Sequence, residues 1–224
     1  MSATDKPLLT IAARQHGVVS TAQALEAGYT AAWLSRAAHS GRLEQVGACV
    51  WRFRVFPSTP HTWAQAACLA LGPSCLVSHQ TAAWLWKLDV DTGSAETHVT
   101  VPMGTTVRAG VAAAVHKSRQ LTNQDRARIG RLPVTTLART LVDLATVLSD
   151  GTYIGLLDDA LVRGLVTPDR IQAVLRRIGP GRPGTRLVRA GLEPWAEPDG
   201  IESHAEVLFA RWLARHSVPP PVRL

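Results

Sequence analysis

The first fifty-six residues place apolar and polar positions in a pattern that predicts three short helices followed by two strands. Apolar residues recur at helical spacing in residues 8–15, and again after Ser20 and after Thr30. Residues 42–46 and 49–55 alternate loosely, as strands do. Two short helices joined by a glycine-containing turn and followed by a hairpin are typical of a winged helix-turn-helix, the fold that presents a helix to the major groove of DNA.

Signals at the helix ends support this interpretation. Ser20 is a good N-cap, and Gln23 completes a capping box with it. Ala24 and Leu25 are expected to form the buried face of this helix, and Gly28 stands where a helix end favours a left-handed residue. These signals predict a short positioning helix that ends in a tight turn.

The helix after this turn is the predicted reading helix. Its inner face is expected to hold Trp33, Leu34, Ala37 and Ala38. The predicted DNA surface combines the outer face of this helix with residues of the positioning helix and with the arginines that flank the reading helix. It consists of Thr21, Gln23, Thr30, Ala31, Ala32, Ser35, Arg36, His39, Arg42, Arg52 and Arg54. Within it, Ser35, Arg36 and His39 can hydrogen bond to base edges, and an arginine contact to guanine would be the strongest.

The same pattern also fits a protein that never binds DNA, because short amphipathic helices joined by glycine turns are common. Arg36 is the only permanent cation on the reading helix. Since lysine and arginine supply the phosphate contacts that carry affinity, a single copy is expected to bind weakly and in a salt-sensitive way.

The rest of the chain predicts an α+β protein. Expected helices cover 62–71, 79–87, 137–148, 154–163 and 168–177, and expected strands cover 97–102, 111–116 and 132–135. A proline-containing hinge is expected at 57–60. We predict four parts: a winged helix at 1–56, an α+β domain at 57–178, a linker at 179–198 and an amphipathic helix within 199–224.

The linker contains the sequence GPGRPG at 179–184, which matches a dinucleotide-binding pattern literally. We reject that interpretation because the run follows a helix instead of a strand, and two of its six residues are prolines without an amide hydrogen. The arginines around it are expected to be solvated, with contact to a nucleic-acid backbone as the alternative: Arg176, Arg177, Arg182, Arg186 and Arg189.

Charge and composition narrow the class of partner. The net charge is +7, and residues 1–56 hold six Lys/Arg against three Asp/Glu, so a polyanion such as double-stranded DNA is the natural partner. An arginine-rich solvated surface would explain the charge equally well. The three cysteines form no CxxC pair and no HExxH occurs, so we expect no metal and no cofactor. Without a signal peptide or a long apolar run, a cytoplasmic location and no membrane contact are expected.

Several stretches resemble a known family. LLTIAARQHGVVSTAQALEAGYTAAWLSRAAHSGRLEQV (8–46) resembles the winged-helix domain of AbiEi-type antitoxins of type IV toxin–antitoxin systems. The middle is similar to actinobacterial proteins of this group in SHQTAAWLW (78–86), THVTVP (97–102), VHKSR (115–119) and LPVTTLARTLVDLA (132–145). The resemblance implies operator binding, repression of the protein's own operon, and a cognate toxin.

Two departures from the family pattern matter. Ala48 to Trp51 stand where relatives often carry an Arg-Gly-Val-Tyr wing tip, so the wing lacks a phosphate-binding arginine. Residues 203–221 resemble the opening helix of a very-short-patch-repair-like endonuclease domain, yet the sequence ends before the acidic strand residues that such nucleases need for divalent cations. Glu202 and Glu206 alone form no such site. We therefore expect a truncated nuclease-like segment and a protein that is not an enzyme.

Three functions thus remain open. The first is a DNA-binding transcriptional regulator of the antitoxin type. The second is a truncated, catalytically inactive member of an endonuclease-like family. The third is an interaction module that binds a toxin or a second copy of the chain through exposed tryptophans, with Trp84, Trp86 and Trp212 as the candidates and Trp212 the most open of them.

Overall fold

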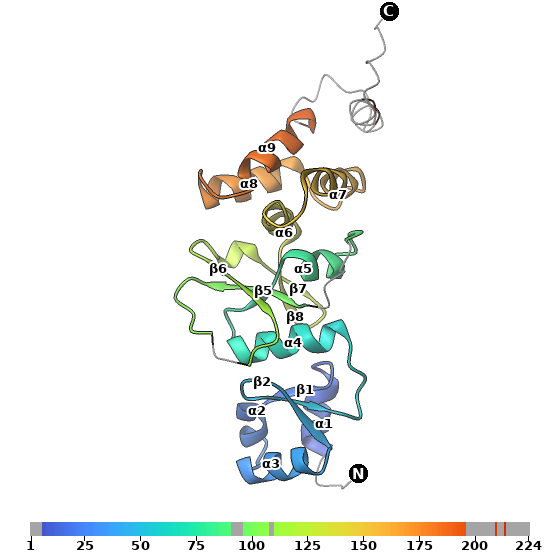
Figure 1. Ribbon diagram of the computed structural model, residues 1–224, viewed down its shortest axis with the longest axis vertical. Helices are drawn as coiled ribbons and strands as arrows, with labels where there is room; N and C mark the ends of the chain where they lie inside the picture. The colour runs from blue at the N-terminus through green and yellow to red at the C-terminus, as the bar shows by residue number, and fades with distance from the viewer. Residues whose placement is uncertain (1–5, 91–95, 108–109, 196–208, 210–212, 214–224) are drawn as a thin grey trace, which may run out of the picture. The chain divides into compact units, whose positions relative to one another are not determined.

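The computed structural model describes residues 6–90, 96–107, 110–195, 209 and 213. The chain forms two compact units, Met1–Thr136 and Leu137–Leu224. The first unit opens with a winged helix made of α1 (Lys6–Ala13), β1 (Val18–Ser20), α2 (Thr21–Glu26), α3 (Ala31–His39), β2 (Leu43–Gly47) and β3 (Val50–Phe53) (Figure 1). Its three strands pair antiparallel in the order β1-β3-β2. The protein is an α+β protein, as predicted.

The core of the winged helix is built from one apolar face of each helix. Leu8, Ala24 and Leu34 come from the three helices and are buried together with Phe53 of the hairpin. The predicted inner face of α3 is confirmed, since two of its four residues are buried and two are half-buried. Leu25, however, is 51% exposed, which corrects the expected inner face of α2. It lies about 100° around the helix from Ala24, and this short helix buries only a narrow stripe.

The second part of the first unit is a sheet with two helices. Its elements are α4 (Pro60–Leu71), β4 (Leu76–Val77), α5 (His79–Leu85), β5 (His98–Pro102), β6 (Ala114–Ser118), a 3-10 turn at Asn123–Asp125, β7 (Arg126–Ile129) and β8 (Leu132–Thr135). The strand order is β6-β5-β4-β8-β7, and alanines of α4 pack on the valines of the sheet. Trp84 and Trp86 pack against this core, and Trp86 donates its indole N–H to the Thr135 carbonyl at 2.9 Å. The interpretation of these two tryptophans as core residues is therefore favoured.

The predicted hinge at residues 57–60 leads into α4, which begins at Pro60. The Thr59 hydroxyl accepts a hydrogen bond from the Thr62 amide, and Pro60 opens the helix. The Thr62 hydroxyl is buried and donates to the backbone carbonyl of His16 at 3.0 Å. Because His16 precedes β1, this bond ties α4 to the winged helix.

The second unit is helical in its described part. It contains α6 (Leu137–Leu144), α7 (Asp150–Val162), α8 (Pro168–Ile178), α9 (Thr185–Leu192) and a 3-10 turn at Glu193–Trp195. This division differs from the expected boundaries at 57–178 and 179–198. All eight residues of α6 are buried, and α6 packs on α8, so the chain divides before α6.

The expected linker is also replaced in its described part, because α9 buries Val188 and Leu192 between residues 179 and 195. Ion pairs fix the loop that leads into α9. Asp143 and Arg139 on α6 are fully buried and lie 3.0 Å apart, and Arg182 of the GPGRPG run binds the same carboxylate at 2.6 Å. Arg182 is therefore a structural residue and not a solvated charge.

The predicted C-terminal helix falls almost entirely outside the described residues, as does Trp212. Phe209 and Leu213 are described, and they are exposed and buried respectively. Within the described ranges, no helix combines the length and the apolar character needed to cross a bilayer.

Candidate nucleic-acid interface

Helix α3 presents the face that the sequence assigned to DNA. Its N-cap is Thr30, whose hydroxyl accepts a hydrogen bond from the Trp33 amide at 3.1 Å. One side of the helix is buried in the core of the winged helix. The predicted outer residues are exposed: Ala31, Ala32, Ser35, Arg36 and His39. The structure therefore brings these five residues together on one solvent-facing surface of a helix that is capped and anchored.

The chemistry of this surface lies in three side chains. Ser35, Arg36 and His39 can donate or accept hydrogen bonds, whereas the two exposed alanines at the start of α3 carry only a methyl group each. In the part of the chain that the structure describes, the Arg36 side chain makes no hydrogen bond and no ion pair. Its guanidinium is thus free to bind an anion or a base edge without first breaking an internal contact.

Two further arginines lie together at the open end of the hairpin. The backbone amide of Arg54 donates to the carbonyl of Arg42 at 3.1 Å, and both residues are exposed. The Arg42 guanidinium carbon lies 5.5 Å from the centre of the Trp33 ring, and its Nε donates to the Ser40 hydroxyl at 3.2 Å. Arg42 is therefore held against α3, while Arg54 extends the basic surface on the neighbouring strand end.

Arg52 has a different environment, although the sequence grouped it with these arginines. Its guanidinium binds Glu44 at 2.6 Å across the hairpin and also donates to the Phe56 carbonyl at 3.0 Å. The Arg52 side chain is 14% exposed. Because the charge is paired and largely covered, Arg52 fits a role in holding β2, β3 and the following turn together better than a role in binding phosphate.

Thr21 and Gln23 are likewise engaged inside the winged helix. The Thr21 hydroxyl accepts from the indole of Trp51 at 2.8 Å. The Gln23 side chain accepts from the Ser20 amide at 2.9 Å and pairs with the amide of Gln15. These bonds confirm the predicted capping box and leave the two side chains less available to a ligand than those of α3.

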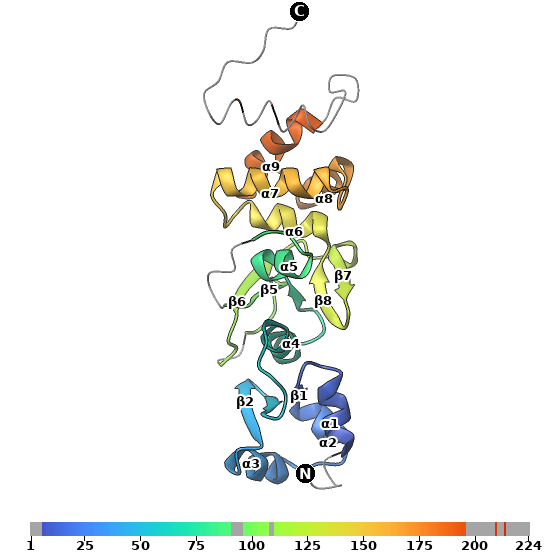
Figure 2. The same cartoon turned by 90° about the vertical axis from the view of Figure 1, so that its right-hand side faces the viewer.

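The tip of the β2–β3 hairpin points away from α3. Figure 2 shows β2 running from α3 toward α4. Val46 and Val50 pack with Ala66 of α4, and residues 44–48 line a pocket of about 430 Å³ with Trp63 and the loop at 110–112. A wing tip without arginine suits this position, because it contacts protein. Nothing in the local sequence signals this long-range contact, so sequence reasoning missed it.

Fold and surface together define the class of this region: a winged helix-turn-helix with an exposed, arginine-bearing second helix. Residues 6–47 match the model of a protein family described as transcriptional regulator, AbiEi antitoxin. This is a family of regulators and antitoxins and not of enzymes, and the match spans the helix-turn-helix and β2.

The wider comparisons concern the fold. The chain is similar to a solved structure described as the crystal structure of RV2827C protein from Mycobacterium tuberculosis, with 18% identity and a TM-score of 0.57 over 99% of this chain and 84% of that one. Among curated proteins the comparison finds no match. The structural likeness supports the α+β architecture over nearly the whole chain, whereas the family match concerns residues 6–47 alone.

Proposed function

We propose that this protein is a DNA-binding transcriptional regulator that inserts α3 into the major groove of an operator. The observation that carries the proposal is the combination of a regulator-family match over residues 6–47 with an exposed α3 face whose Arg36 is unpaired among the described residues. Arg36, Ser35 and His39 would read bases, while Arg42 and Arg54 would bind phosphates at one end of the helix. Thr30 would position α3 through its cap.

A mobility-shift titration tests this proposal. The purified full chain is titrated onto the DNA upstream of its own gene and onto random DNA of equal length, at several salt concentrations. We expect selective binding of the upstream DNA that weakens steeply as salt rises, because phosphate contacts release counterions. Equal or absent binding on both DNAs would contradict the proposal.

The variant Arg36→Ala locates the reading surface. We expect it to weaken operator binding by roughly 1–3 kcal/mol, the usual cost of losing a base contact by arginine. Arg128→Ala is the matched control, since Arg128 is an exposed arginine on β7 of the same unit. Both substitutions remove one charge, so a loss common to both would reflect general electrostatics, whereas an unchanged affinity of Arg36→Ala would move the reading surface elsewhere.

The finer role follows the antitoxin description. We propose that the protein represses its own operon and counteracts a cognate toxin, with the second unit and the middle sheet available for contacts to protein. A promoter-reporter assay tests the first part, because overexpression should lower expression from the upstream DNA, and Arg36→Ala should restore it. A second copy of the chain is a further candidate partner, because helix-turn-helix proteins often bind two half-sites as dimers.

We further propose that the protein has no nuclease activity, although residues 203–221 resemble the start of an endonuclease-like domain. The support is the description of the matched family, which is one of regulators. Purified protein is incubated with plasmid DNA and Mg²⁺ beside a preparation that contains only the affinity tag. Cleavage above that control would favour the nuclease alternative.

A further inference from the structure

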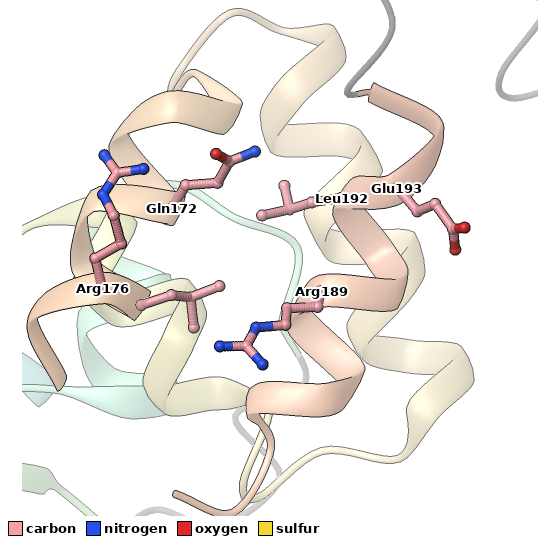
Figure 3. A pocket seen from close by; sticks show the side chains of 6 residues that line it. Gln172, Arg176, Arg189, Leu192 and Glu193 are labelled. Carbon is pink, nitrogen blue, oxygen red and sulfur yellow. The ribbon is translucent and has the colours of Figure 1, made fainter. Parts of the chain in front are cut away.

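A groove in the second unit lies between two basic helix faces. It has a volume of about 290 Å³ and is lined by Gln172, Leu175 and Arg176 of α8 and by Arg189, Leu192 and Glu193 at the end of α9 (Figure 3). The three α8 residues are spaced i, i+3 and i+4, so they share one face of the helix, and the same spacing holds on the other wall. Helix α8 packs on α6, and α9 packs on α7.

Two polar side chains, Arg189 and Gln172, point into the groove, whereas the Arg176 guanidinium points along α8 and away from α9 (Figure 3). In Figure 3 the Arg189 guanidinium extends toward α8, the Gln172 amide points toward Leu192, and the Glu193 carboxylate points away from the groove. Neither Arg176 nor Arg189 forms an ion pair or side-chain hydrogen bond with any described residue. By contrast, Arg139, Arg163 and Arg182 of the same unit are each paired with an aspartate.

We propose that this groove binds an acidic segment of a partner protein, with a carboxylate held by Arg189 and Gln172 and an adjacent apolar side chain set over Leu175 and Leu192. Charge complementarity favours the carboxylate, because the Arg189 guanidinium and the Gln172 amide offer several donors inside the groove, Arg176 adds positive charge at its edge, and the Glu193 carboxylate is turned outward. Leu175 and Leu192 at the groove floor provide the contact for the apolar side chain. An apolar floor bordered by arginine is typical of protein interfaces, whereas a nucleic-acid backbone needs a row of donors on an open surface.

The proposal is independent of DNA binding, since it concerns another unit of the chain. The test uses full-length protein labelled with ¹⁵N and the probe N-acetyl-Leu-Glu-Glu-Leu-amide, followed by NMR. The uncharged peptide N-acetyl-Leu-Gln-Gln-Leu-amide serves as the control ligand. We expect the acidic peptide to shift the side-chain Nε–Hε signals of Arg176 and Arg189, and the uncharged peptide to shift them much less.

Variants then separate the groove from general charge. We expect Arg189→Gln to weaken binding of the acidic peptide about tenfold, the effect of losing a charge-assisted hydrogen bond. Arg186→Gln is the control, because Arg186 is an exposed arginine of α9 that does not line the groove. The proposal requires that Arg186→Gln bind the acidic peptide with an affinity within about twofold of that of the unchanged protein. This difference is much smaller than a tenfold change, which corresponds to about 1.4 kcal/mol.

Three results would overturn the proposal. The first is a failure of the acidic peptide to bind at millimolar concentration, or equal binding by Arg189→Gln. The second is a stronger response of the same arginine signals to inorganic phosphate or duplex DNA, which would make the groove a phosphate site. The third is a change of these signals with protein concentration alone, which would make a second copy of the chain the occupant.

Discussion

The winged helix and the helical second unit both depend on arginine, but they place it in opposite environments. On α3, Arg36 faces solvent with no ion pair among the described residues, and the outer face of the helix is open for a ligand. On α6, Arg139 is fully buried, binds Asp143, and shares that carboxylate with Arg182. The net charge of +7 therefore does not indicate by itself which arginines are available for binding. The partner of each arginine decides whether its charge stabilises the fold or remains available for binding.

The largest effect should follow from breaking the buried charge network. Asp143→Ala leaves Arg139 buried without its counter-charge, so we expect the free energy of unfolding of the second unit to fall by about 3–5 kcal/mol. Calorimetry or urea denaturation of the full chain measures this. Asp159→Ala, which breaks the exposed Asp159–Arg163 pair, is the control and should cost less than about 1 kcal/mol.

The double variant Arg139→Met with Asp143→Leu gives a second check. Replacing both charges by apolar side chains of similar size removes the unpaired charge, so it should recover most of the lost stability. Equally small losses of unfolding free energy in Asp143→Ala and Asp159→Ala would contradict the expected difference between buried and exposed arginines.

Glycine in the two regions offers the next contrast. Gly184 (φ +80°) precedes α9, and a Cβ there would lie 2.7 Å from the carbonyl oxygen of Ala145. Gly28 (φ +86°), in the turn between α2 and α3, has open space around it. We expect Gly28→Ala to cost about 1–2 kcal/mol from the left-handed backbone alone. Gly184→Ala should cost more, since the clash with the α6–α7 connection adds to this strain.

Hydrogen exchange of the full chain would localise both effects. Gly184→Ala should expose amides of α6 and α9, and Gly28→Ala should affect α2 and α3. A mild Gly184→Ala would show that the loop before α9 is as loosely held as the linker that its sequence predicted.

Local signals explain which parts of the fold could be predicted. The capping box of Ser20 and Gln23 and the left-handed turn at Gly28 define the ends of α2 by local structure, and both stand as expected. The outer face of α3 follows from helical periodicity alone. Strands β1, β4 and β7 were not predicted, because alternation over two to four residues is a weak signal; β8, of the same length as β7, was predicted.

The missed features depend on contacts between residues far apart in the sequence. Arg182 looks like a solvated charge in a glycine–proline run, and only the fold brings it to Asp143, thirty-nine residues away. Arg52 looks like Arg54, yet strand register places Glu44 opposite Arg52. The candidate site was therefore predictable where it lies on one helix, and less so where pairing across the hairpin decides which arginine is free.

Arg52→Ala sharpens this distinction inside the winged helix. We expect it to lower the free energy of unfolding by about 1 kcal/mol, because a partly covered ion pair and a hydrogen bond to Phe56 are lost. Its effect on operator binding should be smaller than that of Arg36→Ala, which in turn should leave the unfolding free energy unchanged. Urea denaturation and mobility shifts on both variants measure the two quantities. Reversed results would place Arg52 on the DNA surface.

The smallest expected effect is a change of stability with pH, and it compares partly buried histidines with the exposed His39 of α3. Burial lowers the pKa of His16, of His61 and of His98 below 6.5. The positive charge of His61 lowers the pKa of His16 further, and that of Lys87 lowers the pKa of His61 further. The His16 and His61 rings stack with their centres 5.0 Å apart. The unfolded chain then binds protons at these sites more tightly than the folded one. Stability is therefore present above pH 6.5 and is lost as the pH falls through the lowered pKa values.

Thermal unfolding between pH 8 and pH 5 measures this loss. We expect the melting temperature of the unchanged protein to drop below pH 6.5, and that of His61→Asn to drop less steeply, because one of the two stacked rings no longer gains a proton. His39→Asn, on the exposed face of α3, is the matched control and should follow the unchanged protein. Parallel curves for all three proteins would show that the His16–His61 stack between the winged helix and α4 does not sense pH, and that its rings only fill space at that contact.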